Sequence, residues 1–431
     1  MKKILVVGGG WAGLSAALHL SQNPNNQVTV FEAAPQVGGR ARGVRFSDQD
    51  WVDNGQHLLL SAYTEVKTLL RLINSPPSHY DEQDFKLTFF KPKGKMSLTF
   101  PKNPSVVAGL KSLIMAQGLS FKERLQLAKF MRQLNQETSV PGLSAEAYLQ
   151  RDLSQNLIKA LWEPLCLAAL STPLHKASAQ VFVNVLQACF NQARAAQILW
   201  PHQDVGQFLP KPVVDYLRAC NHKVLLHSRA SELIIRGDQC LGVIVNKIPY
   251  LADAVVLAMP PKTAAQLLPV HPLLQGSKAN LNQFEYEPIT TLYVKYEQMV
   301  NFPQDLFGLA NSPFHWIFNR QTSGQGHFLA AVITGPSHMD DLSATAMADL
   351  LEQELQALGI NLPQRVSSKV IREKQAAFSC TVAAQALRPS NNSPLNNLWL
   401  AGDYTQTPYP ATLEGAVLSG RLCAMGIDAT C

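Results

Sequence analysis

The sequence predicts an α/β fold in which a Rossmann-like domain is interrupted by a mixed α+β domain with a helical, membrane-facing part. Three observations support this prediction. A strand and three closely spaced glycines open the chain, strand-like segments return after a long helical stretch, and a strand and a small-residue helix end it. We expect the first domain at 1–75, 205–265 and 390–431, and the second at 76–204 and 266–389.

The first elements are an apolar strand at 4–7, the motif Gly8-x-Gly10-x-x-Gly13 and a helix. The first glycine suits a tight turn, the second admits a diphosphate, and the third lets helix and strand pack closely. The helix N-terminus favours such an anion. A second strand at 27–31 ends at Glu32, where a ribose-binding carboxylate is expected. These features predict a dinucleotide site and are not explained by a secretory signal.

A glycine-rich basic loop follows at 38–43. It places Gly39 next to Arg40 and Arg42, and guanidinium groups in such a loop suit a diphosphate.

The next polar segment, 53–57, holds groups that can transfer protons. Asp53, Gln56 and His57 are its chemically capable members. His57 and Asp53 are the candidate acids, and histidine is the better suited near neutral pH. The alternative is an ordinary solvated loop.

The predicted second domain begins after Pro76 and Pro77 with a β-hairpin over 87–100. Two basic amphipathic helices come next, with apolar positions predicted to share one face of each. These positions are Val106, Leu110, Leu113 and Ile114 in the first, and Phe121, Leu125, Ala128, Met131 and Leu134 in the second. Such a pair can lie on a membrane surface or pack as ordinary helices. Residues 144–196 continue as an apolar helical stretch.

The nucleotide-binding pattern then resumes. Strands are predicted at 223–227, 233–235 and 240–245, and a buried strand that ends in a turn at 254–261. Further strands are predicted at 291–294 and 328–334 around the aromatic cluster 314–318, and a helix at 344–358. A last strand ends at Gly402-Asp403 and precedes a helix of small residues within 410–420. Asp403 suits a cofactor hydroxyl, and the helix N-terminus suits developing negative charge.

Composition narrows the function further. Of 431 residues, 46% are hydrophobic and 16% charged, which indicates extensive apolar burial or contact with lipid. The net charge of +6 is too diffuse to predict nucleic-acid binding. The seven cysteines are scattered and never form C-x-x-C, which favours a reducing cytoplasm and disfavours a flavin disulfide reductase. We expect no metal site and no membrane-spanning segment.

Together, these motifs resemble the amine oxidase and phytoene desaturase superfamily of flavoproteins. The resemblance implies one FAD in a Rossmann-like domain of the glutathione-reductase-2 type. It assigns the ADP half to Gly8, Gly10, Gly13 and Glu32, the diphosphate and flavin edge to Gly39, Arg40 and Arg42, and the ribityl–flavin end to Asp403 with residues 414–416. The full cofactor set that we expect is Gly8, Gly10, Trp11, Ala12, Gly13, Glu32, Ala33, Gly39, Arg40, Arg42, Gly55, Gln56, His57, Gly402, Asp403, Thr412, Leu413 and Ala416.

Four segments, at 8–13, 53–57, 161–170 and 411–416, more closely resemble the squalene-associated FAD-dependent desaturases, the family of hydroxysqualene dehydroxylases. This resemblance implies that reduced FAD replaces the allylic hydroxyl of hydroxysqualene with hydrogen. The substrate would be a lipophilic isoprenoid. The chain would be cytoplasmic or bound peripherally to the inner membrane.

No second glycine fingerprint follows a later strand, so an external electron donor is expected. Three alternatives stay open: a carotenoid-precursor desaturase or isomerase, a flavin amine oxidase, and a prenyl-carrying protein without chemistry.

Overall fold

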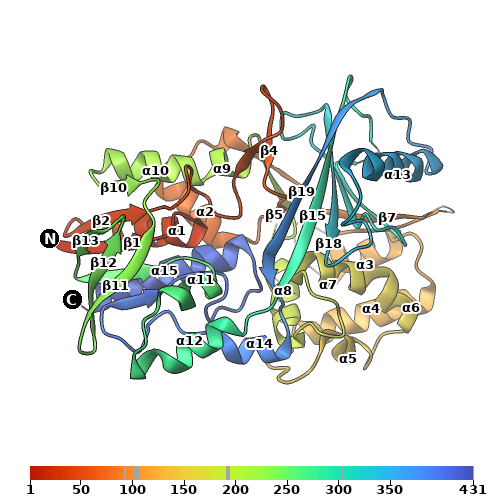
Figure 1. Ribbon diagram of the computed structural model, residues 1–431. Coiled ribbons are helices and arrows are strands. Elements are labelled where there is room, and N and C mark those ends of the chain that lie inside the picture. Colours follow the sequence, from red (N-terminus) through yellow and green to blue (C-terminus); the bar gives the residue numbers. More distant parts are fainter. Residues whose placement is uncertain (92–93, 101–105, 191–194, 303, 431) are drawn as a thin grey trace.

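The computed structural model describes residues 1–431 except 92–93, 101–105, 191–194, 303 and 431. Figure 1 shows a parallel sheet with flanking helices at one end of the molecule. A large, mostly antiparallel sheet lies at the other end, above a group of helices.

The parallel sheet has five strands in the order β10-β2-β1-β14-β20, and every neighbouring pair is parallel. The strands are β1 (Lys2–Val7), β2 (Asn26–Phe31), β10 (Lys223–Leu225), β14 (Ala254–Leu257) and β20 (Leu398–Leu400). Each of the three segments predicted for this domain supplies at least one strand, which agrees with the predicted Rossmann-like arrangement. The domain boundaries themselves stay a prediction.

Helices α1 (Trp11–Leu20) and α15 (Leu413–Ala429) pack tightly against each other beside this sheet. The contact requires Gly420, because a Cβ there would lie 2.3 Å from the Ala12 carbonyl oxygen. The Ser15 hydroxyl also donates to the Val417 carbonyl at 2.7 Å. The N-termini of the two helices are therefore held in a fixed relation.

An antiparallel meander and several short helices complete this half of the molecule. The meander consists of β11 (Ala230–Arg236), β12 (Gln239–Val245) and β13 (Ile248–Leu251). The helices are α2 (Thr64–Leu72), α9 (Val205–Phe208), α10 (Pro210–Ala219), α11 (Pro261–Leu267), α12 (Gln275–Asn282) and α14 (Val382–Leu387), with 3₁₀ turns η1 (Pro77–His79) and η3 (Pro272–Leu274).

The second large sheet has the order β19-β15-β18-β17-β16-β7-β8. Its strands are β7 (Lys86–Lys91), β8 (Gly94–Thr99), β15 (Tyr286–Tyr296), β16 (Leu306–Leu309), β17 (Trp316–Asn319), β18 (Phe328–Thr334) and β19 (Arg365–Phe378). Helix α13 (Ala344–Ala357) packs on it through an apolar core. Smaller sheets pair β3 (Gly43–Arg45) with β4 (Trp51–Asp53), and β9 (Ile198–Pro201) with β5 (Leu59–Leu60) and β6 (Tyr80–Gln83).

The predicted hairpin over 87–100 is confirmed as the antiparallel pair β7–β8, and positions 92 and 93 lie outside the described residues. The long β19 was not predicted, because most of its residues are half-buried and polar or charged side chains interrupt any apolar alternation.

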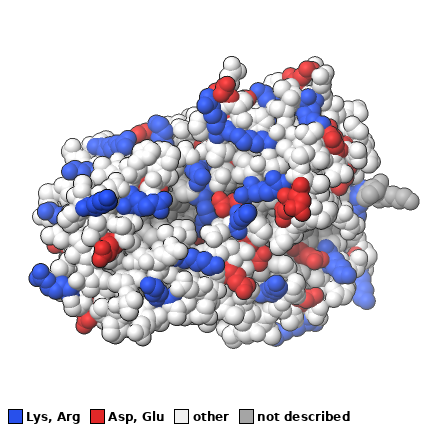
Figure 2. Space-filling view, viewed as in Figure 1, with Lys and Arg blue, Asp and Glu red and all other residues white. Residues whose placement is uncertain are grey.

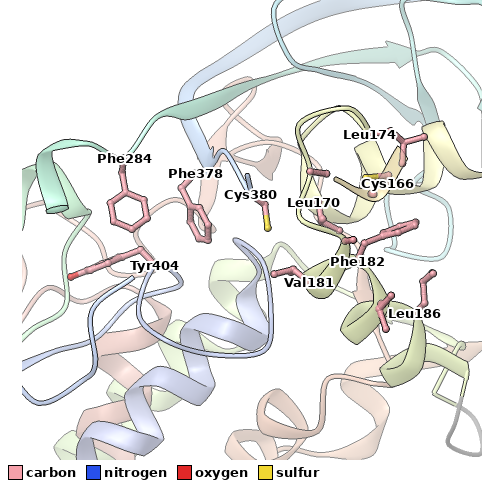
Figure 3. Close-up of a cluster of buried hydrophobic side chains, with 14 of the residues drawn as sticks. Cys166, Leu170, Leu174, Val181, Phe182, Leu186, Phe284, Phe378, Cys380 and Tyr404 are labelled. Atoms are coloured by element: carbon pink, nitrogen blue, oxygen red, sulfur yellow. The ribbon is translucent and has the colours of Figure 1, made fainter. Parts of the chain in front are cut away.

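The helical part comprises α3 (Val106–Met115), α4 (Phe121–Leu134), α5 (Ala145–Leu149), α6 (Gln155–Leu157), a π-helical turn η2 (Ile158–Trp162), α7 (Glu163–Leu170) and α8 (Ala179–Phe190). Its core includes Trp162, whose ring lies edge-on to Phe130 and Phe182. Figure 3 shows Phe182 with Leu170 and Cys166 in this cluster.

The apolar face predicted for α4 is buried only in part, since Leu134 lies in the core and Met131 packs against it. Leu127, Phe130 and Leu134 are buried, whereas Phe121 and Leu125 are 77% and 56% exposed. Ser120 starts the helix in a capping box with Glu123, whose side chain is itself buried. Among the described residues, no helix is long and apolar enough to cross a bilayer.

Candidate functional site

A cavity of about 750 Å³ lies between the carboxyl ends of the parallel strands and the mostly antiparallel sheet. Open α/β sheets bind ligands at this edge. Among the cofactor residues predicted from the sequence, those lining the cavity are Gly8, Gly10, Trp11, Ala12, Glu32, Ala33, Gly39, Arg40, Gln56, His57, Gly402, Asp403, Thr412, Leu413 and Ala416. Gly13, Arg42 and Gly55 do not line it.

The three glycines of the first loop have separate roles. Gly8 has a φ of +115°, and a Cβ there would lie 2.2 Å from the Ala258 carbonyl oxygen. A Cβ on Gly13 would lie 2.0 Å from the Gly8 carbonyl oxygen, so Gly13 sets the contact between helix and strand. By contrast, a Cβ on Gly10 meets nothing closer than the Gly39 Cα at 3.9 Å, and both glycines line the cavity. Gly10 and Gly39 therefore present bare backbone side by side on the cavity wall, a surface that a diphosphate can approach closely.

The start of α1 suits that anion. Gly10 is the N-cap residue, no side chain caps the helix, and its first turn holds no acidic residue. The backbone N–H groups and the helix dipole therefore face the cavity without a competing carboxylate. The Trp11 indole donates to the Ala41 carbonyl at 3.0 Å and fixes the basic loop beside this helix.

Glu32 lies at the end of β2, as predicted. Its Oε2 accepts from the Gly9 N–H and its Oε1 from the Ala34 N–H, both at 2.7 Å. These bonds orient the carboxylate at the rim of the glycine loop, where a ribose hydroxyl can reach it. Arg229 and Ser228 line the same end of the cavity and were not predicted, because they follow a short strand without a recognisable motif.

Arg40 and Asp403 form an ion pair at 2.7 Å, although they are 363 residues apart in sequence. The Arg40 guanidinium also donates to the Ala376 carbonyl at 2.9 Å. It therefore connects the end of β20 with the end of β19. Arg42 points elsewhere: its guanidinium donates to the Gly39 carbonyl and lines a neighbouring surface pocket. It stabilises the loop from behind.

Asp53 differs from its predicted role. Its carboxylate accepts from the Val205 N–H at 2.8 Å and from the Arg320 guanidinium at 3.1 Å, and it does not line the cavity. Arg320 is only 2% exposed and also donates to the Gln56 side chain. The Asp53–Arg320 ion pair therefore holds the loop that carries Gln56 and His57. Sequence reasoning missed Arg320, which follows a buried strand without a motif.

His57 lines the cavity, and its Nδ1 atom is buried without a hydrogen-bond partner among the described residues. Burial is the main cause that lowers the pKa of His57 below 6.5, against the opposing effect of Asp53. Burial therefore favours the neutral form of the imidazole. The Gln56 backbone N–H donates to the Thr291 hydroxyl at 3.3 Å and fixes the loop on β15.

The N-terminus of α15 forms another wall of the cavity. Thr412 caps it by accepting from the Gly415 N–H at 3.1 Å. Glu414 does not face the cofactor side. Its carboxylate instead accepts from the N–H groups of Glu65 and Val66 at 2.9 and 3.1 Å, at the start of α2. Burial raises the pKa of Glu414 to about 7.

The remaining part of the cavity is apolar. In the whole lining of the cavity, the charged and imidazole side chains are those of Glu32, Arg40, His57, Arg229 and Asp403. The other end is formed mainly by Leu58, Leu60, Phe85, Ala168, Ala169, Val185, Leu306, Trp316, Phe318 and Val332. The predicted aromatic cluster thus contributes Trp316 and Phe318. The cavity therefore has one half lined by polar and charged groups and another half lined by apolar side chains.

The chain resembles known proteins over nearly its whole length. The chain is 28% identical over 438 residues to hydroxysqualene dehydroxylase of Rhodopseudomonas palustris, covering 98% of this chain and 97% of that protein. It is 22% identical to 15-cis-phytoene desaturase of Synechococcus elongatus, covering 99% and 96%. An oxidoreductase from Methanosarcina mazei has a similar fold, with a TM-score of 0.77 and 16% identity over 99% of this chain and 100% of that one.

The family model for flavin containing amine oxidoreductases matches residues 11–427. This confirms the superfamily predicted from the sequence. The chain therefore belongs to the flavin-containing amine oxidoreductase family and is an FAD-dependent oxidoreductase.

Proposed function

We propose that this protein reductively removes the allylic hydroxyl of hydroxysqualene to give squalene. The observation that supports this most directly is the apolar half of the cavity, which carries no charged side chain to receive an amine substrate. A long isoprenoid buries its apolar surface there, and each buried CH₂ contributes roughly 0.8 kcal/mol. The similarity to hydroxysqualene dehydroxylases points to the same substrate.

The reaction needs a proton for the leaving oxygen and a hydride for the carbon. The carbon–oxygen bond breaks, the oxygen leaves as water after accepting a proton, and a new carbon–hydrogen bond forms. When bound, reduced FAD supplies the hydride. His57 is the candidate proton donor, because it lines the cavity beside the predicted flavin edge. Asp53 is not, because its carboxylate is used to hold Arg320 and the Val205 N–H.

The electrons come from outside the chain in this proposal. Within the described residues, only one sheet is fully parallel, and its strand ends already line the FAD site. A reductase partner, a free reductant or transiently bound NAD(P)H would therefore reduce the flavin.

The decisive experiment is anaerobic incubation of the chemically reduced protein with hydroxysqualene. We expect squalene and one equivalent of oxidised flavin. His57→Ala should slow product formation, whereas replacing the exposed His338 should not. Squalene formation at an unchanged rate by H57A would remove His57 from the mechanism.

The relatives also support a second candidate, desaturation of a carotenoid precursor. This reaction would run electrons in the opposite direction, so the oxidised protein would consume phytoene. Parallel incubations of oxidised protein with phytoene and of reduced protein with hydroxysqualene separate the two. Failure of both would refute an isoprenoid redox substrate.

We further propose that α3 and α4 rest on a membrane surface. Ile114, Met115, Phe121 and Leu125 are between 56% and 77% exposed and lie close together in sequence. Not all basic residues of this region are free: Lys129 pairs with Asp152, and Arg124 donates to the Ile114 and Ala116 carbonyls. Figure 2 shows Lys and Arg spread over the visible face among acidic residues, so apolar insertion carries more of this proposal than charge.

Liposome flotation tests this surface. We expect binding to vesicles with anionic lipid, and its loss in the double variant Phe121→Glu/Leu125→Glu. Val270→Glu is the matched control, because Val270 is 92% exposed but lies far along the chain from these helices. Equal binding by both variants, or no binding by the unchanged protein, would contradict the proposal.

A further inference from the structure

A buried arginine lies behind the loop that connects β20 with α15. This loop, residues 401–412, supplies Asp403, Tyr409 and Thr412 to the lining of the FAD cavity. Arg388 follows α14, is 3% exposed and does not line the cavity itself. No motif in the sequence singled it out.

The Arg388 guanidinium uses its nitrogens to bind the loop at several points. The Nε donates to the Thr405 carbonyl at 2.9 Å. One terminal nitrogen donates to the Tyr409 carbonyl at 2.9 Å, and the other to the Asp403 carbonyl at 3.1 Å and the Thr407 hydroxyl at 2.8 Å. A further bond, at 3.1 Å, reaches Gln385. A planar guanidinium has five N–H donors and can bind all of these acceptors at once, whereas the ammonium group of a lysine has three and cannot.

Asp403 is thus held from two sides. Arg40 pairs with its carboxylate, and Arg388 binds its backbone carbonyl. The guanidinium carbon of Arg388 also lies 5.4 Å from the centre of the Phe378 ring. Figure 3 shows Phe378 between Cys380 and Tyr404, beside Phe284. The end of β19 and the Asp403 loop therefore share one rigid support.

Arg388 carries its charge without a carboxylate partner. Among the described residues, no acidic oxygen lies within 4.0 Å of its guanidinium, since the Asp403 carboxylate is taken by Arg40. Its acceptors are carbonyls, a hydroxyl and an amide. A buried cation without a carboxylate in direct contact favours added negative charge nearby, and reduction of a flavin adds negative charge.

We propose that Arg388 is the positioning residue of the flavin end of the site. It fixes Asp403 and Tyr409 against the cofactor, and its buried charge makes the bound flavin easier to reduce. The two effects can be separated by substitution. Arg388→Lys keeps the positive charge but loses the planar set of N–H donors, whereas Arg388→Met loses both the charge and the donors.

The test measures FAD affinity and the midpoint potential of the purified holoprotein, without substrate. We expect R388K to bind FAD about tenfold more weakly at a nearly unchanged potential. R388M should also shift the potential by about 30 mV to more negative values, which is a tenfold change for a two-electron couple. If R388M does not fold, R388K still tests the positioning role through FAD affinity.

Leu351→Ala serves as the matched control, because Leu351 is fully buried in the core around α13 and does not line the cavity. It should lower thermal stability and leave the flavin potential unchanged. Wild-type FAD affinity in R388K would overturn the positioning role. An unchanged potential in R388M, or an equal shift in L351A, would overturn the effect of the charge.

Discussion

Replacing Gly10 by alanine should separate cofactor binding from folding. Gly10 has φ −76° and ψ 179°, a conformation that alanine adopts without strain. Its added Cβ would lie 3.9 Å from the Gly39 Cα, which is ordinary contact. Loss of a favourable N-cap residue should cost at most about 1 kcal/mol. The apoprotein should therefore keep nearly its original melting temperature.

FAD binding should suffer far more, because the new methyl group keeps the diphosphate from approaching the backbone where Gly10 lines the cavity. Losing one hydrogen bond to a charged group costs roughly 1.5–3 kcal/mol. At 1.4 kcal/mol for each tenfold, this predicts FAD affinity about 10- to 150-fold weaker. Quenching of flavin fluorescence on titration into apoprotein measures the affinity, and a thermal melt of the same sample measures stability.

Gly13→Ala is the companion variant. Its Cβ would lie 2.0 Å from the Gly8 carbonyl oxygen, so α1 must move away from β1. Overpacking of this kind costs about 1–3 kcal/mol and should lower the melting temperature of the apoprotein. Wild-type FAD affinity in Gly10→Ala would refute the placement of the diphosphate. Equal destabilisation by both variants would refute the division of roles.

Three further predictions concern buried polar groups. Arg320→Met should destabilise the protein by about 3–5 kcal/mol, because it leaves the Asp53 carboxylate buried and unpaired; adding Asp53→Asn should recover part of the loss in denaturant melts. If His57 donates its proton as an imidazolium, turnover should rise as pH falls through a pKa below 6.5, and a flat profile between pH 5 and 7 would argue against this role. The raised pKa of Glu414 means that the folded state binds its proton more tightly than the unfolded state, so its contribution is present below pH 4.5 and is lost as pH rises through about 7. Glu414→Gln should therefore reduce the loss of stability between these pH values, as measured by thermal melts.

Much of the nucleotide-binding half could be predicted because its signals are local. The spacing of Gly8, Gly10 and Gly13, the strand before them and Glu32 after the next strand each follow from backbone geometry within a short segment. Asp403 was predicted for the same reason, since it follows a buried strand and precedes a helix. The substrate half was less predictable. β19 is half exposed, and the buried face of α4 depends on what packs against it.

By itself, then, the sequence determined the cofactor class, the parallel-strand segments and most of the residues that line the cofactor half of the cavity. Only the tertiary structure decided which polar groups support the site from behind. Asp53 pairs with Arg320, Asp403 with Arg40, and Arg388 binds the Asp403 loop, across separations of 267, 363 and 15 residues respectively. A buried charge needs a partner or a full set of hydrogen bonds. The partner can come from any part of the chain that the fold places beside it. Such pairings are not local, and for this reason they leave no motif in the sequence.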